Sequence, residues 1–97
     1  MVPYEEVICR AIREMWVLTF VYEMKQRTVE PYALYYTKDG DDPILEAWQL
    51  SGGSAVDWRD FHLAKLSVPT ITGTHFSKRF GYRKESPRRG RVLCQEG

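Results

Sequence analysis

The sequence predicts a mainly β protein in which one N-terminal helix precedes a small five-stranded antiparallel barrel. Helical spacing of apolar residues is confined to residues 3–15, and from Trp16 onward apolar and polar residues alternate instead. The alternating segments are short, evenly spaced and separated by turn-forming residues, which favours an antiparallel meander. Five such strands curl readily into a barrel, and a helix can cover an exposed edge or an open end.

Residues 3–15, PYEEVICRAIREM, carry the helix signals in the expected order. Pro3 suits the first turn, and the acidic side chains of Glu5 and Glu6 lie near the positive end of the helix dipole. The apolar residues recur at helical spacing: Val7, Ile8, Ala11, Ile12 and Met15. We therefore expect a short amphipathic helix with one face to bury.

Five segments after the helix read as strands, joined by turns at 25–27 and 38–42 and by the SGGSA loop at 51–55. Pro31 is expected at a bend or edge position, because proline cannot donate to a strand ladder. The expected strands are residues 16–24, 28–37, 43–50, 56–63 and 67–76.

The chain of 97 residues is long enough for one domain, which we place at residues 1–82. Residues 83–97 carry five basic and two acidic side chains with no periodicity, so we expect a basic, disordered tail. No apolar run approaches the roughly 18 residues of a membrane span, and no secretory signal is recognisable. These features predict a soluble, cytoplasmic protein.

Cys9 and Cys94 lie at opposite ends of the sequence, without the spacing of a metal site. We expect two reduced thiols, no metal and no cofactor.

The order of signals resembles the WYL domain, a β-barrel of bacterial transcription regulators and phage-defence proteins. The segments that carry the resemblance are AIREMWVLTFVYEMKQRTVEPYAL, a turn with Gly40, ILEAWQL and RDFHLAKL, and together they extend over about residues 8–80. The positions that match the family pattern are Tyr22, Arg27, Val29, Pro31, Arg59, Phe61 and Leu63, and Lys65 and Leu66 close the last signature. The sequence departs from the pattern at Pro43 and Ile44, where the family has Trp and Tyr, and at Lys65, where it has Arg.

The resemblance implies an SH3- or Sm-like barrel without catalytic activity. It also implies a basic and aromatic groove at the barrel rim that binds a negatively charged, nucleotide-like ligand or single-stranded nucleic acid. The expected ligand-binding residues are Tyr22, Arg27, Arg59, Phe61, His62 and Lys65. The alternative function is a protein-interaction or oligomerisation module, which would use an exposed aromatic edge strand to dock a regulator or a second copy.

The residues themselves leave other interpretations open. Arg59 shares a strand face with Phe61 and Leu63, and it could instead pair with Asp57 or Glu30. His62 could act as a general base, but a hydrogen-bonded pair with Asp60 on the same strand face is the simpler account. The aromatic residues could form a stacking platform for bases or could pack against one another: Trp16, Tyr35, Tyr36, Trp48 and Trp58. The basic tail could contact nucleic-acid phosphates.

Overall fold

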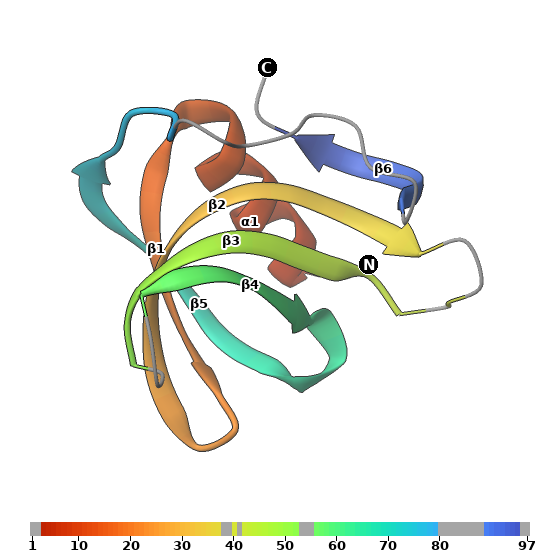
Figure 1. Cartoon of the computed structure of the whole chain (residues 1–97), viewed down its shortest axis with the longest axis horizontal. Helices are drawn as coiled ribbons and strands as arrows, with labels where there is room; N and C mark the ends of the chain where they lie inside the picture. Colours follow the sequence, from red (N-terminus) through yellow and green to blue (C-terminus); the bar gives the residue numbers. More distant parts are fainter. Residues whose placement is uncertain (1–2, 38–39, 41, 53–55, 80–88, 96–97) are drawn as a thin grey trace.

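The computed structural model describes residues 3–37, 40, 42–52, 56–79 and 89–95, and within them it shows one helix and six strands (Figure 1). The helix α1 (Pro3–Glu14) and all five expected strands are confirmed. The expectation of only five strands is wrong, because a sixth is present. The strands are β1 (Trp16–Tyr22), β2 (Lys25–Thr37), β3 (Ile44–Ser51), β4 (Asp57–His62), β5 (Leu66–His75) and β6 (Arg89–Gln95).

The hairpin turn between β1 and β2 lies at Glu23 and Met24, and not at residues 25–27 as expected. Glu23 and Met24 both have positive φ, 52° and 64°, and Tyr22 pairs directly with Lys25. Consecutive left-handed residues are typical of a tight two-residue hairpin turn, but Glu and Met are not the residues usually found there. The shift places Arg27 inside β2, opposite Phe20 on β1.

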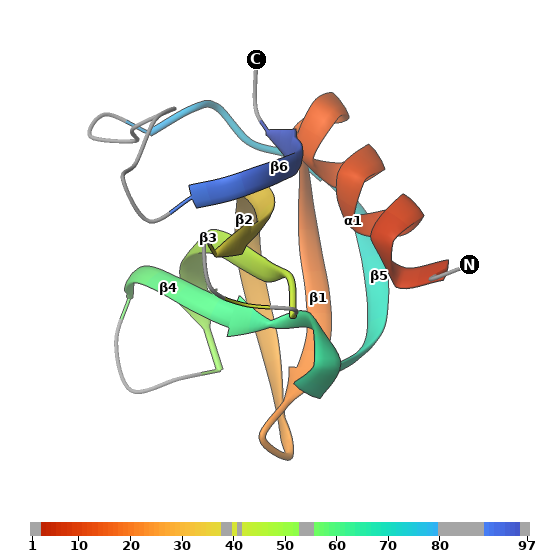
Figure 2. The ribbon, with the colours of Figure 1, turned by 90° about the vertical axis from the view of Figure 1, so that its right-hand side faces the viewer.

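The antiparallel sheet has the order β4-β3-β2-β1-β5, and β6 is added on β2 (Figure 2). The 13-residue strand β2 pairs with β3 from Thr28 to Tyr35. Its other edge pairs with β1 up to Val29 and with β6 from Ala33. The expected irregularity at Pro31 is present, because the register with β3 shifts between Pro31 and Ala33. The short 3-10 turn η1 (Leu63–Lys65) connects β4 to β5.

The C-terminal segment forms part of the sheet, which corrects the expectation of a disordered tail over residues 83–97. Residues 89–95 form β6, where Leu34 pairs with Cys94 and Tyr35 with Val92. The rest of the expected tail, 83–88 and 96–97, lies outside the described residues. Within this strand Cys94 is only 6% exposed and Leu93 packs against the core, although the basic residues around them dominate the composition.

The expectation of two reduced cysteines is also wrong, because Cys9 on α1 and Cys94 on β6 form a disulfide. Disulfides persist in oxidising compartments and are rare in the cytosol, so the cytoplasmic location stays a prediction that the structure does not support. No helix in the described part of the chain is long and apolar enough to cross a membrane.

The core lies between α1 and one face of the sheet, which we call the inner face. Ile8, Ala11 and Ile12 of the helix are fully buried, as the helical spacing predicts. They pack in one cluster with inner-face residues of the strands: Leu18, Phe20, Tyr22, Val29, Leu34, Leu45, Ala47 and Phe61. The opposite side of the strands is the outer face.

Candidate functional site

Two of the expected ligand-binding residues, Tyr22 and Phe61, belong to the core. Phe61 is 1% exposed, and its ring centroid lies 5.0 Å from that of Tyr22 and 4.9 Å from that of Phe20, in edge-to-face contacts. The Tyr22 hydroxyl accepts a hydrogen bond from the backbone N–H of His62 at 3.2 Å. These contacts hold β4 against β1, so both rings act in packing rather than as a surface for a ligand.

Arg27 is buried, with a side chain that is only 5% exposed. Its Nε and Nη2 both donate to the carbonyl of Tyr22, at 3.3 and 3.2 Å, and its Nη1 donates to Oε1 of Gln49 at 3.0 Å. The carboxylate of Glu23 lies 3.6 Å from Nη2, but the Glu23 side chain is 63% exposed. The guanidinium is therefore well supplied with neutral acceptors, while its buried charge is only weakly compensated.

Arg59 lies on the inner face of β4 at the same end of the sheet. Strand alternation places it on the side of Phe61, and it pairs with the core residue Ala47 of β3. Gln49, two residues further along β3, shares that face and bonds Arg27. Arg59 is half-buried, and within the described part of the chain its side chain makes no hydrogen bond or ion pair. Arg27, Gln49 and Arg59 thus occupy adjacent strands β2, β3 and β4, and we call this region the arginine end.

His62 and Lys65 lie away from the arginine end. His62 lies three positions after Arg59 on β4, roughly 10 Å along the strand, and alternation places it on the opposite face. His62 Nδ1 lies 2.9 Å from Oδ2 of Asp42, so Asp42 provides a partner for the ring that sequence reasoning had not identified. Lys65 is exposed at the end of η1. The six expected residues therefore do not line one groove.

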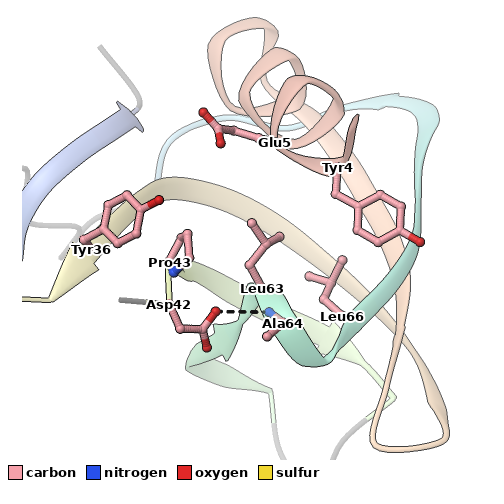
Figure 3. A pocket seen from close by; sticks show the side chains of 8 residues that line it. All are labelled: Tyr4, Glu5, Tyr36, Asp42, Pro43, Leu63, Ala64 and Leu66. Atoms are coloured by element: carbon pink, nitrogen blue, oxygen red, sulfur yellow. Dashed lines mark hydrogen bonds between the residues drawn. The ribbon is translucent and has the colours of Figure 1, made fainter. Parts of the chain in front are cut away.

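A pocket of about 440 Å³ lies between the N-terminal end of α1, the end of β2 and the turn η1 (Figure 3). The Asp42 carboxylate borders it and caps η1 by accepting the backbone N–H of Ala64 at 3.2 Å. Among the described residues, the lining holds two acidic side chains and no basic one: Tyr4, Glu5, Tyr36, Asp42, Pro43, Leu63, Ala64 and Leu66. An anionic ligand is disfavoured there. The sequence did not reveal this pocket, because Glu5 already had an explanation as a helix-dipole residue.

Two of the tryptophans that were candidates for a stacking platform, Trp48 and Trp58, lie on the outer face, away from Arg59. Trp48 and Trp58 are directly paired across β3 and β4, and their rings meet edge-to-face at 5.3 Å. Tyr32 contacts Trp58 at 4.9 Å, and burial raises the pKa of the Tyr32 hydroxyl to about 12. Trp16 stacks instead on His75 at 3.7 Å. The packing interpretation of these aromatic residues accounts for all of these contacts.

Among the described residues, no group of three or more His, Cys, Asp or Glu side chains could hold a metal ion. No protein-family model, no curated protein and no solved structure matches this chain. The resemblance to the WYL domain therefore stays a prediction, and the candidate site depends on geometry alone.

Proposed function

We propose that this chain is a non-catalytic binding module that holds a small phosphate-bearing, nucleotide-like anion at the arginine end. The observation that carries the proposal is the buried Arg27 guanidinium, whose nearest carboxylate is a mostly exposed side chain at 3.6 Å. Because the Glu23 carboxylate is mostly exposed to water, it compensates the buried charge of Arg27 only in part, and the remaining positive field favours an anion nearby. Arg59 adds a second guanidinium on the same face, and it has no partner within the described chain.

The two arginines would have different roles. Arg27 is fixed by Tyr22 and Gln49, so it supplies a stationary positive field rather than a direct contact. Arg59 is half-buried and free to turn its planar fork toward two phosphate oxygens. Its neighbour Phe61 is locked in the core, so the backbone of Arg59 is already fixed and only its side chain has to be ordered on binding.

A small ligand is favoured over a nucleic-acid strand. Single-strand binding needs basic residues that track the backbone beside aromatic residues that stack the bases. Here Trp48 and Trp58 lie on the outer face, while Arg27 and Arg59 lie on the inner face. A mononucleotide can be held through its phosphate by Arg59 alone, without aromatic residues that stack a series of bases.

The finer fold is part of the same proposal: an SH3- or Sm-like barrel of the WYL type, closed by β4 and β5. It is supported by the order of one helix followed by antiparallel strands and by η1, which joins the two strands at the ends of the sheet path. A closed barrel would leave the arginine end as part of its rim.

Replacing Arg59 with Ala tests the site, with binding of a fluorescent adenine nucleotide measured by polarisation. One charge-assisted contact contributes about 1.5–3 kcal/mol, so we expect affinity to fall by at least roughly tenfold. Lys65→Ala is the matched control, because it removes an exposed cation outside the arginine end and should leave affinity unchanged. Unaltered affinity in a folded Arg59→Ala protein, or an equal loss in both variants, would refute the site.

A second candidate is a protein-interaction module that pairs through a sheet edge. It is favoured by the position of β4 and β5 at the two ends of the strand order, each with one described partner. Light scattering after size exclusion tests it for self-association. A dimer at micromolar concentration that persists in Arg59→Ala would support this candidate, and a monomer at all concentrations would count against self-association.

A further inference from the structure

The outer face of the sheet carries a site shaped for a guanidinium group. Glu30 on β2 is directly paired with Trp48 on β3, so a carboxylate and an indole ring lie side by side. The Arg79 guanidinium lies over that ring at 4.6 Å. Its Nε donates to Oε1 of Glu30 at 2.7 Å and its Nη2 donates to Oε2 at 3.2 Å. We call Glu30, Tyr32 and Trp48 the cradle.

The cradle is selective for arginine on chemical grounds. The two parallel N–H donations match a planar fork, and the flat face of a guanidinium stacks on an indole, whereas an ammonium is a point charge that can do neither. The Glu30 side chain is only 8% exposed. Loss of the cation would leave a buried carboxylate uncompensated, which is costly, so the cradle requires an occupant.

The occupant is held less firmly than the cradle. Glu30, Tyr32 and Trp48 lie on paired strands, while Arg79 belongs to the segment Phe76–Arg79 that follows β5 without regular structure. That segment is attached by the Phe76 ring against Tyr32 at 5.3 Å, by the Phe76 N–H to the carbonyl of Met15 at 3.0 Å, and by the Arg79 N–H to the Tyr32 hydroxyl at 2.8 Å. The Arg79 side chain remains 37% exposed.

One hydrogen-bond donor of the cradle has no acceptor among the described residues. The indole N–H of Trp48 is buried and has no hydrogen-bond acceptor within the described residues. Buried donors are normally paired, so an acceptor that reached this nitrogen once residues 76–79 had moved would satisfy it.

We propose that the cradle is an arginine-recognition site, occupied here in cis by Arg79, that binds an arginine side chain on an extended segment of a partner protein when Phe76–Arg79 is displaced. The cis contact is thus autoinhibitory. The inference is independent of the anion site, because the cradle lies on the opposite sheet face and selects a cation.

The test is to titrate the Arg79→Ala protein with a short capped peptide that contains one arginine and to follow binding by tryptophan fluorescence. The matched control is the same peptide with lysine in place of the arginine, called the lysine peptide. We expect saturable binding of the arginine peptide to Arg79→Ala, at least tenfold tighter than that of the lysine peptide, and weaker binding to the wild-type chain because Arg79 competes. The double variant Glu30→Gln with Arg79→Ala should lose this preference. A folded Arg79→Ala protein that binds neither peptide, or that binds both equally, would overturn the proposal.

If Arg79→Ala does not fold, the wild-type chain decides the matter by NMR. The arginine peptide at millimolar concentration should shift the indole N–H signal of Trp48, while the lysine peptide should not. Identical spectra with the two peptides would overturn the proposal.

Discussion

Breaking the Cys9–Cys94 disulfide should remove much of the stability of this domain. The bond joins residues 85 positions apart in the sequence, so it closes a loop that includes nearly the whole fold. In the chain-entropy treatment, a loop of that length corresponds to about 4–5 kcal/mol of restriction of the unfolded state. Small domains have a free energy of unfolding of about 5–15 kcal/mol, so the reduced protein should be marginal.

Urea unfolding followed by tryptophan fluorescence, with and without a phosphine reductant, measures this effect. For a domain of this size, about 4–5 kcal/mol corresponds to a fall in Tm of roughly 20–35 °C, so thermal unfolding gives a second readout. Both cysteines are only 6% exposed, so the reductant should be added to unfolded protein before refolding.

The Cys9→Ser and Cys94→Ser double variant is the control. It should unfold at the midpoint of the reduced protein, and reductant should not change that midpoint. Equal midpoints for oxidised and reduced wild-type protein, or free thiols in the oxidised protein by alkylation, would refute the reasoning.

Three further predictions concern the core, two glycines with positive φ, and pH. Phe61→Ala should lower the free energy of unfolding, measured in urea, by about 3–5 kcal/mol. Replacement of the exposed Lys65 with Ala should change it by less than about 0.5 kcal/mol. Equal effects of the two substitutions would contradict the assignment of Phe61 to the core. Gly52→Ala should lower the free energy of unfolding more than Gly73→Ala does. Both glycines have positive φ, 99° and 90°, so both substitutions are strained. Of the two, only Gly52 lies so close to backbone that an added Cβ atom would be 2.9 Å from Cα of Arg27. If thermal unfolding shows a larger fall in Tm for Gly73→Ala than for Gly52→Ala, the close approach of Gly52 to Arg27 is absent. Burial raises the pKa of Tyr32 from 10.0 to about 12. Below pH 10 both states are protonated and stability is unaffected, but between pH 10 and 12 the unfolded state ionises first, so stability should fall as pH rises. Tyr32→Phe should remove this part of the pH dependence, and an identical alkaline profile in both proteins would contradict it.

The sequence predicted the elements well where periodicity was strong. The apolar stripe of α1 and the alternation in β4 placed Ile8, Ile12 and Phe61 on buried faces, as the structure confirms. The first hairpin turn was misplaced because its left-handed positions are held by Glu23 and Met24, residues that carry no turn signal. The strand β6 was missed because its burial depends on a long-range pairing with β2 and not on local pattern.

The candidate site was predictable only in part, for a related reason. Alternation on β4 placed Arg59 on the face of Phe61, but single-strand patterns do not reveal register between strands. Register places Gln49 between Arg27 and Arg59, and it places Trp48 beside Glu30. Arg79 had no visible role, because its partner Glu30 lies 49 residues earlier. The pairing of Arg59 with Glu30 that the sequence left open is not made, since Arg79 binds that carboxylate.

One edge of β2 pairs with β1 over its first part and with β6 over its last part, and these two partners are synthesised at different times. That edge is paired by β1 soon after the first hairpin is made, but from Ala33 to Thr37 its partner among the described strands is β6, Arg89–Gln95. A nascent chain therefore presents an open strand edge for as long as the intervening residues are being translated, and open edges are templates for wrong pairing. The disulfide between Cys9 and Cys94 also cannot form until Cys94 has been synthesised. The strand β6, which is synthesised after the other five described strands, thus completes this edge of β2 and also brings Cys94 to Cys9.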